Sequence, residues 1–320
     1  MRFKVAVTLA CCALATSCGR AGLEQRGRYS FASLTVRGDA SAVRAALDER
    51  SRALGPIAAV FLNGVALPDD RAGANHVVTI AAKPTDEAGF GVADTIVVDE
   101  TGGGAAVDLV LLAKHGLELP RRIALGTRVV TRANLAANGV ARAAAGDFVL
   151  DLLRREHAAL LGAAAPDTPK VRIGLVQLRP DDPRQARAAA EVTAAARSRP
   201  VVELERVSAA GDVNQQNAAI ASLIREGRAA IVITDDPASL ADVRKSAIVA
   251  NAAVVVIDVD AREDIGTSVG PDQIVLGRAA AEASVRAVPT GGTVLELHAD
   301  LDDPIVRKRH QGFVAALGGF

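Results

Sequence analysis

The chain has 320 residues, of which 50% are hydrophobic and 23% charged, an ordinary globular composition that excludes a disordered or fibrous protein. Lys plus Arg and Asp plus Glu number 37 each, so no long-range field attracts nucleic acid or an acidic membrane. The length is sufficient for two lobes of domain size, each with its own core.

The first residues have the features of an export signal. Met1–Lys4 carries two positive charges, and the apolar run Val5–Ala15 is too short to span a bilayer. The run leads into Ser17-Cys18-Gly19, which resembles a bacterial lipobox, although Ala15 stands where Leu is usual. We expect a signal peptide over 1–18 with Cys18 lipidated, and an ordinary secretory leader is the alternative. Both interpretations place the protein in the periplasm or cell envelope.

The positions of the cysteines and histidines limit which disulfides, metal sites and catalytic groups the protein can contain. The three cysteines, Cys11, Cys12 and Cys18, all lie in the leader region, so we expect neither a disulfide nor a thiolate metal site in the mature fold. The five histidines show no metal-ligand spacing, and no nucleophile–base motif occurs. The sequence therefore predicts no cofactor and disfavours an enzyme.

The first half of the chain alternates β-branched runs with Ala-rich helical stretches. A polar tether over 19–29 precedes them, and a linker at 166–170 follows them. Strands are expected at Phe31–Arg37, Ile57–Leu62, Val77–Ala81, Thr95–Val98 and Ile123–Thr131. Helices are expected at Ala40–Leu54, Gly103–His115 and Asp147–Leu161.

The second half has the same alternation. Strands are expected at Val171–Gln177, Val201–Val207, Ala229–Thr234, Ala253–Ile257 and Thr293–His298. Helices are expected at Pro183–Arg197, Val213–Glu226, Pro237–Ala250, Pro271–Val288 and Pro304–Leu317. Asp182, Asp236 and Asp303 each precede a Pro, which is typical of an N-cap with Pro in the first helical position. The pattern predicts an α/β fold with parallel sheets.

Several segments carry a family resemblance. They are Ile173-Gly-Leu-Val-Gln, Ile220-Ala-Ser-Leu-Ile-Arg-Glu-Gly227, Val254-Val-Val-Ile-Asp258, Ser268-Val-Gly270-Pro-Asp272 and Arg307-Lys-Arg309-His-Gln-Gly312-Phe313. In this order they resemble the first half of ribose-binding-type (type I) periplasmic sugar-binding proteins of ABC importers. Segments similar to that family's second half stand upstream, including Ala59-Val-Phe-Leu-Asn63 and Asp94-Thr-Ile-Val. Residues 171–320 are thus N-terminal-half-like, and residues 30–165 are C-terminal-half-like.

The resemblance implies two Rossmann-like lobes in circularly permuted order. Lobe one would comprise 171–270 with helix 101–116, and lobe two would comprise 30–99, the crossover 120–132 and 271–320. Permutation predicts that Phe31–Arg37 pairs in the same sheet as Thr293–His298 and that Tyr29 lies close to Phe320. The alternative is a gene fragment or a truncated tandem duplication.

The ends of the expected strands supply the candidate site, because ligands of parallel α/β sheets bind beyond the carboxyl ends of the strands. The resemblance implies that Asp258 and Arg307 hydrogen-bond sugar hydroxyls, while Arg184 and Gln185 stand where the family has sugar-stacking aromatic residues. A usual hexose or pentose ligand is therefore disfavoured. The candidate ligand-binding residues are Asp258, Arg307, Asn63, Arg179, Asp182, Asp235, Asp99 and His298.

A glycine-rich loop, Glu100-Thr101-Gly102-Gly103-Gly104, precedes a helix and is open to two interpretations. It either offers backbone N–H groups to an anion or is a plain helix-start loop. Overall, the sequence and the resemblance favour an exported, lipid-anchored solute-binding protein. It would capture a small polar solute for an ABC permease or membrane sensor, without nucleic acid and with membrane contact only through its lipid. The alternative is a non-transporting interaction protein, or a fragment, with a degenerate cleft.

Overall fold

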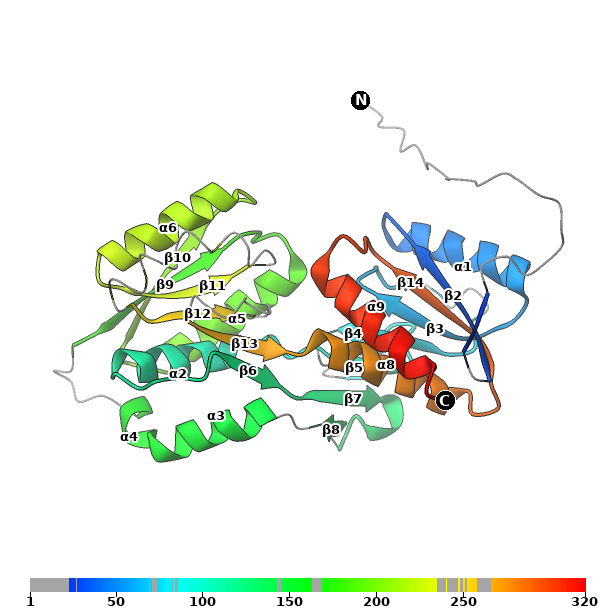
Figure 1. The fold of residues 1–320 in the computed structure, drawn as a ribbon, viewed down its shortest axis with the longest axis horizontal. Helices are drawn as coiled ribbons and strands as arrows, with labels where there is room; N and C mark the ends of the chain where they lie inside the picture. Colours follow the sequence, from blue (N-terminus) through cyan, green and yellow to red (C-terminus); the bar gives the residue numbers. More distant parts are fainter. Residues whose placement is uncertain are drawn as a thin grey trace, which may run out of the picture.

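The structure is a computed structural model. It describes residues 23–26, 28–68, 70, 74–81, 83, 86–137, 139–142, 145–162, 169–234, 240, 247, 250, 252–257 and 266–320. These residues form two α/β lobes that lie side by side, each built on one sheet (Figure 1). The expected α/β class is confirmed.

Lobe one contains a six-stranded sheet in the order β10-β9-β11-β12-β13-β6, in which all neighbouring strands are parallel. Two buried clusters lie on its two faces: α2 and α5 pack on one face, and α6 packs on the other. Helix α3 packs along β6 at the sheet's edge. The strands are β6 (Arg122–Leu125), β9 (Val171–Gln177), β10 (Val202–Ser208), β11 (Ala229–Ile233), β12 (Val254–Ile257) and β13 (Thr267–Pro271), and the helices are α2 (Gly103–Lys114), α3 (Ala145–Glu156), α4 (Ala158–Leu161), α5 (Pro183–Arg197) and α6 (Val213–Arg225).

Lobe two contains an eight-stranded sheet in the order β1-β2-β14-β3-β4-β5-β7-β8. Its strands from β2 to β5 are parallel, whereas β1, β7 and β8 pair antiparallel at the two edges. Helices α8 and α9 cover one face and α1 covers the other. The elements are β1 (Glu24–Arg26), β2 (Tyr29–Thr35), α1 (Ala40–Leu54), β3 (Ile57–Asn63), β4 (Val77–Ala81), β5 (Thr95–Val98), β7 (Thr127–Thr131), β8 (Val140–Arg142), α8 (Gln273–Ala287), β14 (Gly292–His298) and α9 (Pro304–Leu317), with short 3-10 helices at Ala88–Phe90 and Arg132–Asn134.

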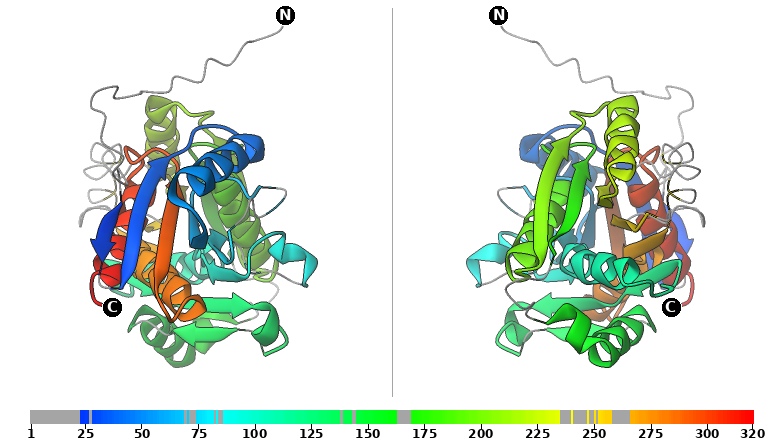
Figure 2. Two further views of the ribbon diagram at one scale, coloured as in Figure 1. Left: turned by 90° about the vertical axis from the view of Figure 1, so that its right-hand side faces the viewer. Right: turned by 90° about the vertical axis from the view of Figure 1, so that its left-hand side faces the viewer.

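The predicted pairing between the first and last thirds of the chain is confirmed. Strand β2 pairs in parallel with β14 in a register that places Phe31 opposite Val294, and β14 pairs with β3 on its other side. The two strands lie side by side in the left view of Figure 2. The C-terminal end of α9 lies near β1 in both Figures 1 and 2. Segments more than two hundred residues apart thus build one core.

Three sequence expectations need correction. Residues Glu24–Arg26, expected within a polar tether, form β1 and pair with β2. The expected strand Ile123–Thr131 divides at Gly126, so that β6 joins the sheet of lobe one and β7 joins that of lobe two. Residues Thr267–Pro271 form the unexpected strand β13, and Asp272 caps α8 by accepting from the backbone N–H groups of Ile274 and Val275.

Smaller differences concern the connecting helix and one edge strand. The expected helix Asp147–Leu161 breaks at His157 into α3 and α4, and the unexpected strand β8 precedes it. The predicted helix Pro237–Ala250, its cap Asp236 and the leader with Cys18 lie outside the described residues. Within the described part of the chain, no helix is both long enough and apolar enough to cross a membrane.

Candidate functional site

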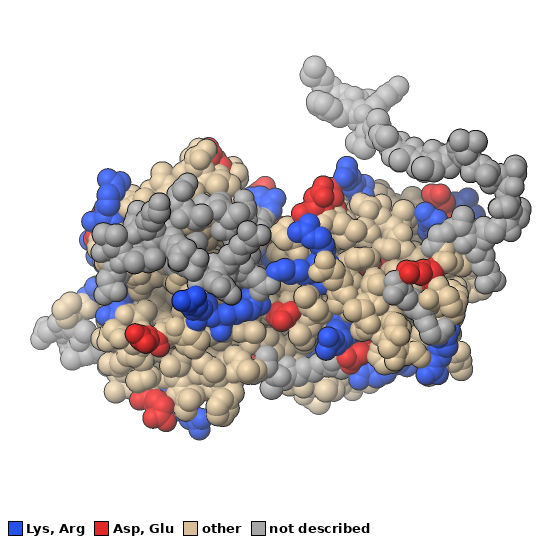
Figure 3. Space-filling model, in the orientation of Figure 1, with Lys and Arg blue, Asp and Glu red and all other residues tan. Residues whose placement is uncertain are grey.

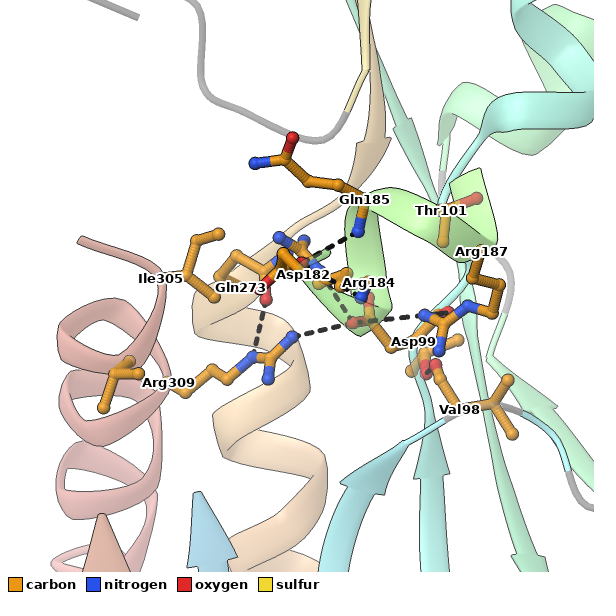
Figure 4. A network of polar contacts seen from close by, with 12 residues as sticks. Val98, Asp99, Thr101, Asp182, Arg184, Gln185, Arg187, Gln273, Ile305 and Arg309 are labelled. Atoms are coloured by element: carbon orange, nitrogen blue, oxygen red, sulfur yellow. Dashed lines mark hydrogen bonds and ion pairs between the residues drawn. The ribbon is translucent and has the colours of Figure 1, made fainter. Parts of the chain in front are cut away.

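A buried carboxylate lies where the two lobes meet. Asp99 directly follows β5, is 5% exposed, and donates its backbone N–H to Ala81 O at the end of β4, which fixes it to lobe two. Three arginines converge on its Oδ2 atom: Arg184 Nε at 2.9 Å, Arg309 Nη2 at 2.9 Å and Arg187 Nη2 at 3.5 Å (Figure 4). Arg187 Nη2 also donates to Asp99 O at 2.9 Å. The carboxylate therefore joins side chains of both lobes.

Local sequence signals aim α5 at this carboxylate. Asp182 caps the helix by accepting from the backbone N–H groups of Arg184 and Gln185, and Pro183 occupies its first turn. Residues three or four apart share a helix face. Arg184, Arg187 and Glu191 therefore lie on one side of α5, the side turned to the segment between β5 and α2. The cap thus sets the angle from which the two guanidinium groups approach.

Helix packing in lobe two positions the third arginine. Arg309 is buried on α9, and its Nε donates to Oε1 of Gln273, the first residue of α8, at 2.7 Å. The two helices approach closely because Gly277 and Gly312 lie at their contact. A Cβ atom on Gly277 would lie 1.9 Å from Arg309 O, and one on Gly312 would lie 2.0 Å from Ile274 O. The glycines are thus required to bring Arg309 to Asp99.

The electrostatics keep Asp99 ionised. Burial alone raises the pKa of Asp99, but the attraction of Arg184, Arg309 and Arg187 outweighs burial and lowers its pKa to about 2. All three guanidinium groups contact the same oxygen, Oδ2. The other oxygen, Oδ1, is buried and has no hydrogen-bond partner among the described residues. One half of a strongly held carboxylate is therefore unused within the described part of the molecule.

The glycine-rich loop packs against α5 beside this carboxylate. Gly102 adopts a positive φ of 79° as the N-cap of α2, and a Cβ atom on Gly103 would lie 2.5 Å from Ala188 O. Thr101 donates its hydroxyl to Glu191 of α5 and also accepts from the Gly103 backbone N–H. The positive φ accounts for Gly102 and the close approach of α5 accounts for Gly103, which favours the plain helix-start interpretation.

A second buried carboxylate lies in lobe two. Glu296, in the middle of β14, is fully buried. Asn63 Nδ2 donates to its Oε1 at 2.9 Å, and its Oε2 lies 2.6 Å from His310 Nδ1 and 3.3 Å from Ser33 Oγ. Asn63 Nδ2 also donates to Val306 O of α9, while the buried Asn63 Oδ1 has no partner among the described residues. Both oxygens of Glu296 are therefore partnered, and an acceptor atom is left over at Asn63.

Three of the predicted ligand-binding residues are buried at the carboxyl ends of strands in the sheet of lobe two. Asp99, Asn63 and His298 end or follow β5, β3 and β14. His298 Nδ1 donates to Ala299 O at 2.6 Å, and its ring centroid lies 5.7 Å from that of His310.

The other predicted residues lie elsewhere. Asp182 acts as the cap of α5, and the exposed Arg179 donates its backbone N–H to Gln185 Oε1. Arg307 is exposed and donates to the carbonyls of Leu301 and Asp302, in the loop before its own helix. Asp235 and Asp258 lie outside the described residues.

Sequence reasoning missed Arg187, Arg309, Glu296 and His310 as site residues, and it noted Arg184 only as a replacement for an aromatic residue. One signal was available. Glu296 interrupts the apolar run of β14, and a charge in a buried strand requires a buried partner. Figure 3 shows Lys and Arg side chains gathered along the middle of one face, where the lobes meet. Across the described residues, no group of three or more His, Cys, Asp or Glu side chains is placed to hold a metal ion.

Comparisons with known proteins agree with the sequence resemblance. Residues 173–320 match the family model of the periplasmic binding protein domain. No curated protein is significantly similar to the chain. Two similar solved structures are an ABC transporter solute-binding protein from Mycobacterium smegmatis with bound glycerol (27% identity, TM-score 0.42) and the fructose-binding periplasmic domain of a hybrid two-component system (25% identity, TM-score 0.38). Each match covers 47% of this chain and 52% and 50% of the respective solved chains, so the chain matches about half the length of either one.

The family match concerns the second half of the chain. Residues 173–320 resemble the periplasmic binding protein domain, and the described residues form two α/β lobes. The expected resemblance to periplasmic binding proteins and the expected α/β class are therefore confirmed, and the circularly permuted order stays a prediction.

Proposed function

We propose that this protein is a receptor that binds a small polar solute at the boundary between its lobes, beside Asp99 and Asn63. The observation that carries the proposal is the convergence of α5 from lobe one and α9 from lobe two on the Asp99 carboxylate, at the carboxyl end of β5. Ligands of parallel α/β sheets bind at this end of the strands.

Two buried acceptor atoms support a solute rich in hydrogen-bond donors. Asp99 Oδ1 and Asn63 Oδ1 both lack a partner within the described residues, and a buried acceptor left without a donor costs about 1–3 kcal/mol. A solute that presents hydroxyl or N–H groups to these atoms removes that cost. Val306 and Arg309, one turn apart on α9, contact Asn63 and Asp99 respectively. One short helical segment therefore links the two acceptors.

The remaining predicted residues keep their proposed roles. We propose that Asp258 and Arg307 reach the solute through its hydroxyl groups, as the family resemblance implies, and that Arg179, Asp235 and His298 line the same boundary. Asp182 would contribute through the cap that orients Arg184. Arg307 can change its role only by releasing the carbonyls of Leu301 and Asp302.

We further propose that the protein is exported, that Cys18 is lipidated, and that the loaded receptor delivers its solute to an ABC permease or presents it to a membrane sensor. The leader over 1–18 and the family match support this proposal. The proposed permuted order is supported by the pairing of β2 with β14, which places the segment 29–35 beside the segment 292–298. The fragment interpretation stays open.

A thermal-shift screen tests solute binding. The purified protein is heated with individual sugars, polyols, sugar acids and amino acids, because a ligand that binds only the folded state raises its Tm. A hit is then titrated by calorimetry against the wild type and against Asn63→Ala. We expect Asn63→Ala to weaken binding about tenfold, the effect of losing one hydrogen bond. Asp108→Asn, a buried substitution inside lobe one, is the matched control and should leave affinity unchanged. Absence of any hit across the screen favours the non-transporting interaction protein.

A further inference from the structure

The hydrogen bonds of Asp99 connect parts of the molecule that no strand pairing connects. The two sheets share no strand, and the described chain passes between the lobes by short segments: residues 99–102 after β5, Gly126 between β6 and β7, and Asp272 before α8. Two of these segments contain a glycine, Gly126 in one and Gly102, with a positive φ, in the other. A glycine has no side chain that restricts the backbone, so these segments restrain the lobes weakly. The relative position of the lobes therefore depends on side-chain contacts across the boundary.

Among the described ion pairs that cross the boundary, those from Arg184 and Arg187 to Asp99 are the most buried, and the pair between Asp99 and Arg309 supports them from within lobe two. Asp99 and Arg309 expose 4% and 6% of their side chains, and Arg184, on the other lobe, exposes 20%. The backbone N–H of Asp99 is fixed to Ala81 O of lobe two, so the bond from Arg184 Nε at 2.9 Å spans the boundary. Arg187 adds a second link from α5 to the same residue, through Asp99 O. Separating the lobes would break both links at once.

We propose that Asp99 is a latch that holds the two lobes together in the protein without ligand, through Arg184 and Arg187 of α5. Arg309 and Gln273 keep the carboxylate aimed at α5 from the side of lobe two. Opening transfers Asp99, Arg184 and Arg187 into water, where each finds new hydrogen bonds. The latch therefore biases the equilibrium without making it irreversible. The proposal needs no solute, so it stands or falls separately from the proposed function.

In this proposal the two carboxylate oxygens of Asp99 have different roles. Oδ2 receives the guanidinium groups and holds the lobes, whereas Oδ1 remains an acceptor. A solute that donates to Oδ1 would bind without displacing the arginines. Because Oδ1 is buried while the lobes are together, such a solute would reach it when the lobes separate and would be enclosed when the arginine contacts form again.

Distance measurements between the lobes test the latch. All cysteines lie at or before Cys18, so the chain that follows the leader accepts two new labels without background. Ala45→Cys on α1 and Ala218→Cys on α6 place spin labels on exposed positions of lobe two and lobe one. Double electron–electron resonance without ligand should give one dominant separation in this background. We expect Asp99→Asn to raise the ratio of the longer to the shorter separation at least about tenfold, since removal of one member of a buried pair leaves the others uncompensated.

Two further variants make the result specific. Arg184→Gln removes one of the two links from lobe one and leaves that of Arg187. It should raise the same ratio even if Asp99→Asn folds poorly, while Arg184→Lys, which keeps the charge, should restore part of the closed population. Asp108→Asn is the control, because that carboxylate is as buried but contacts only residues of lobe one. Wild-type separations in both Asp99→Asn and Arg184→Gln, or an equal change in Asp108→Asn, would overturn the latch.

Discussion

Two buried aspartates, Asp99 and Asp108, are each surrounded by arginine, yet they are used differently. Asp108 lies within α2 and is 2% exposed. Its Oδ2 accepts from Arg154 Nε of α3 at 2.9 Å, and its Oδ1 accepts from Arg199 at 2.8 and 3.2 Å. Both of its oxygens are partnered, and all of its partners belong to lobe one. Asp99 has three arginine partners from two lobes, all on one oxygen.

The difference separates a structural ion pair from a candidate functional one. A fully satisfied buried network specifies one packing arrangement, because any movement leaves a charge without a partner. Asp108 does this for α2, α3 and the end of α5. Asp99 is also buried, but its Oδ1 has no hydrogen-bond partner among the described residues, and it lies at the boundary between the lobes. We therefore expect Asp108 to contribute stability, and we propose solute binding and lobe coupling for Asp99.

The largest effect is expected from removal of the structural carboxylate. Asp108→Ala leaves Arg154 and Arg199 without their carboxylate and should lower the free energy of unfolding by about 3–5 kcal/mol. Urea denaturation followed by circular dichroism measures this directly. The separation of the lobes should not change. A loss below about 1 kcal/mol would show that water replaces the carboxylate at this site, and the comparison with Asp99 would fail.

The second prediction moves an arginine without altering a charge. Gly277→Ala places a methyl carbon 1.9 Å from Arg309 O, far inside van der Waals contact, so α9 must shift and carry Arg309 away from Asp99. We expect a loss of about 1–3 kcal/mol of stability from overpacking, together with a wider distribution of lobe separations. Gly104→Ala on α2 is the control, because its Cβ meets nothing within 4 Å. If Gly277→Ala has wild-type stability and lobe separation, the position of Arg309 does not influence how the lobes are held together.

The third prediction concerns pH. The pKa of Asp99 is lowered from 3.8 to about 2 in the folded protein, chiefly by its arginines acting against burial. A depressed carboxyl pKa contributes stability that is present above the unfolded pKa and lost as pH falls. Between about pH 4 and pH 2 the protein should therefore lose about 2 kcal/mol attributable to Asp99.

The contribution is isolated by comparing urea midpoints of the wild type and Asp99→Asn across this range. The difference in urea midpoint between the wild type and Asp99→Asn should become smaller as pH falls. Protonation of Asp99 removes its charge, and the wild type then resembles the variant. If the difference in urea midpoint stays constant from pH 6 to pH 2, the arginines do not stabilise the charged form of Asp99.

Local signals account for the parts of the fold that sequence predicted best. Helices α5 and α9 have the predicted bounds because an Asp cap and a following Pro define a helix start within a few residues. The division at Gly126 was missed because it depends on which lobe each half of an apolar run meets. Strand β13 was missed because Gly270 and Pro271 weaken the β-branched pattern that identifies its neighbours.

The site was predictable only in part, for a similar reason. Strand ends are visible in the sequence, so the positions of Asp99, Asn63 and His298 could be anticipated. The convergence of Arg184 and Arg309 on one oxygen could not, because it requires both lobes at once. Arg307 and Arg309 show the limit of a family resemblance. They are two residues apart and face different sides of α9, and it is Arg309 that is buried against Asp99.

The smallest effect is expected from an ion pair that looks stronger than it is. Arg37 Nη2 lies 2.5 Å from Asp300 Oδ2, closer than any arginine lies to Asp99, but the two side chains are 77% and 44% exposed. Water and salt screen such a pair, and two long side chains lose rotamer freedom to form it. Arg37→Ala should leave the urea midpoint and the lobe separation within experimental error of the wild type, at both low and high salt. A salt-dependent loss of stability would mean that exposed pairs also hold this fold together, and burial would no longer be what distinguishes Asp99 and Asp108.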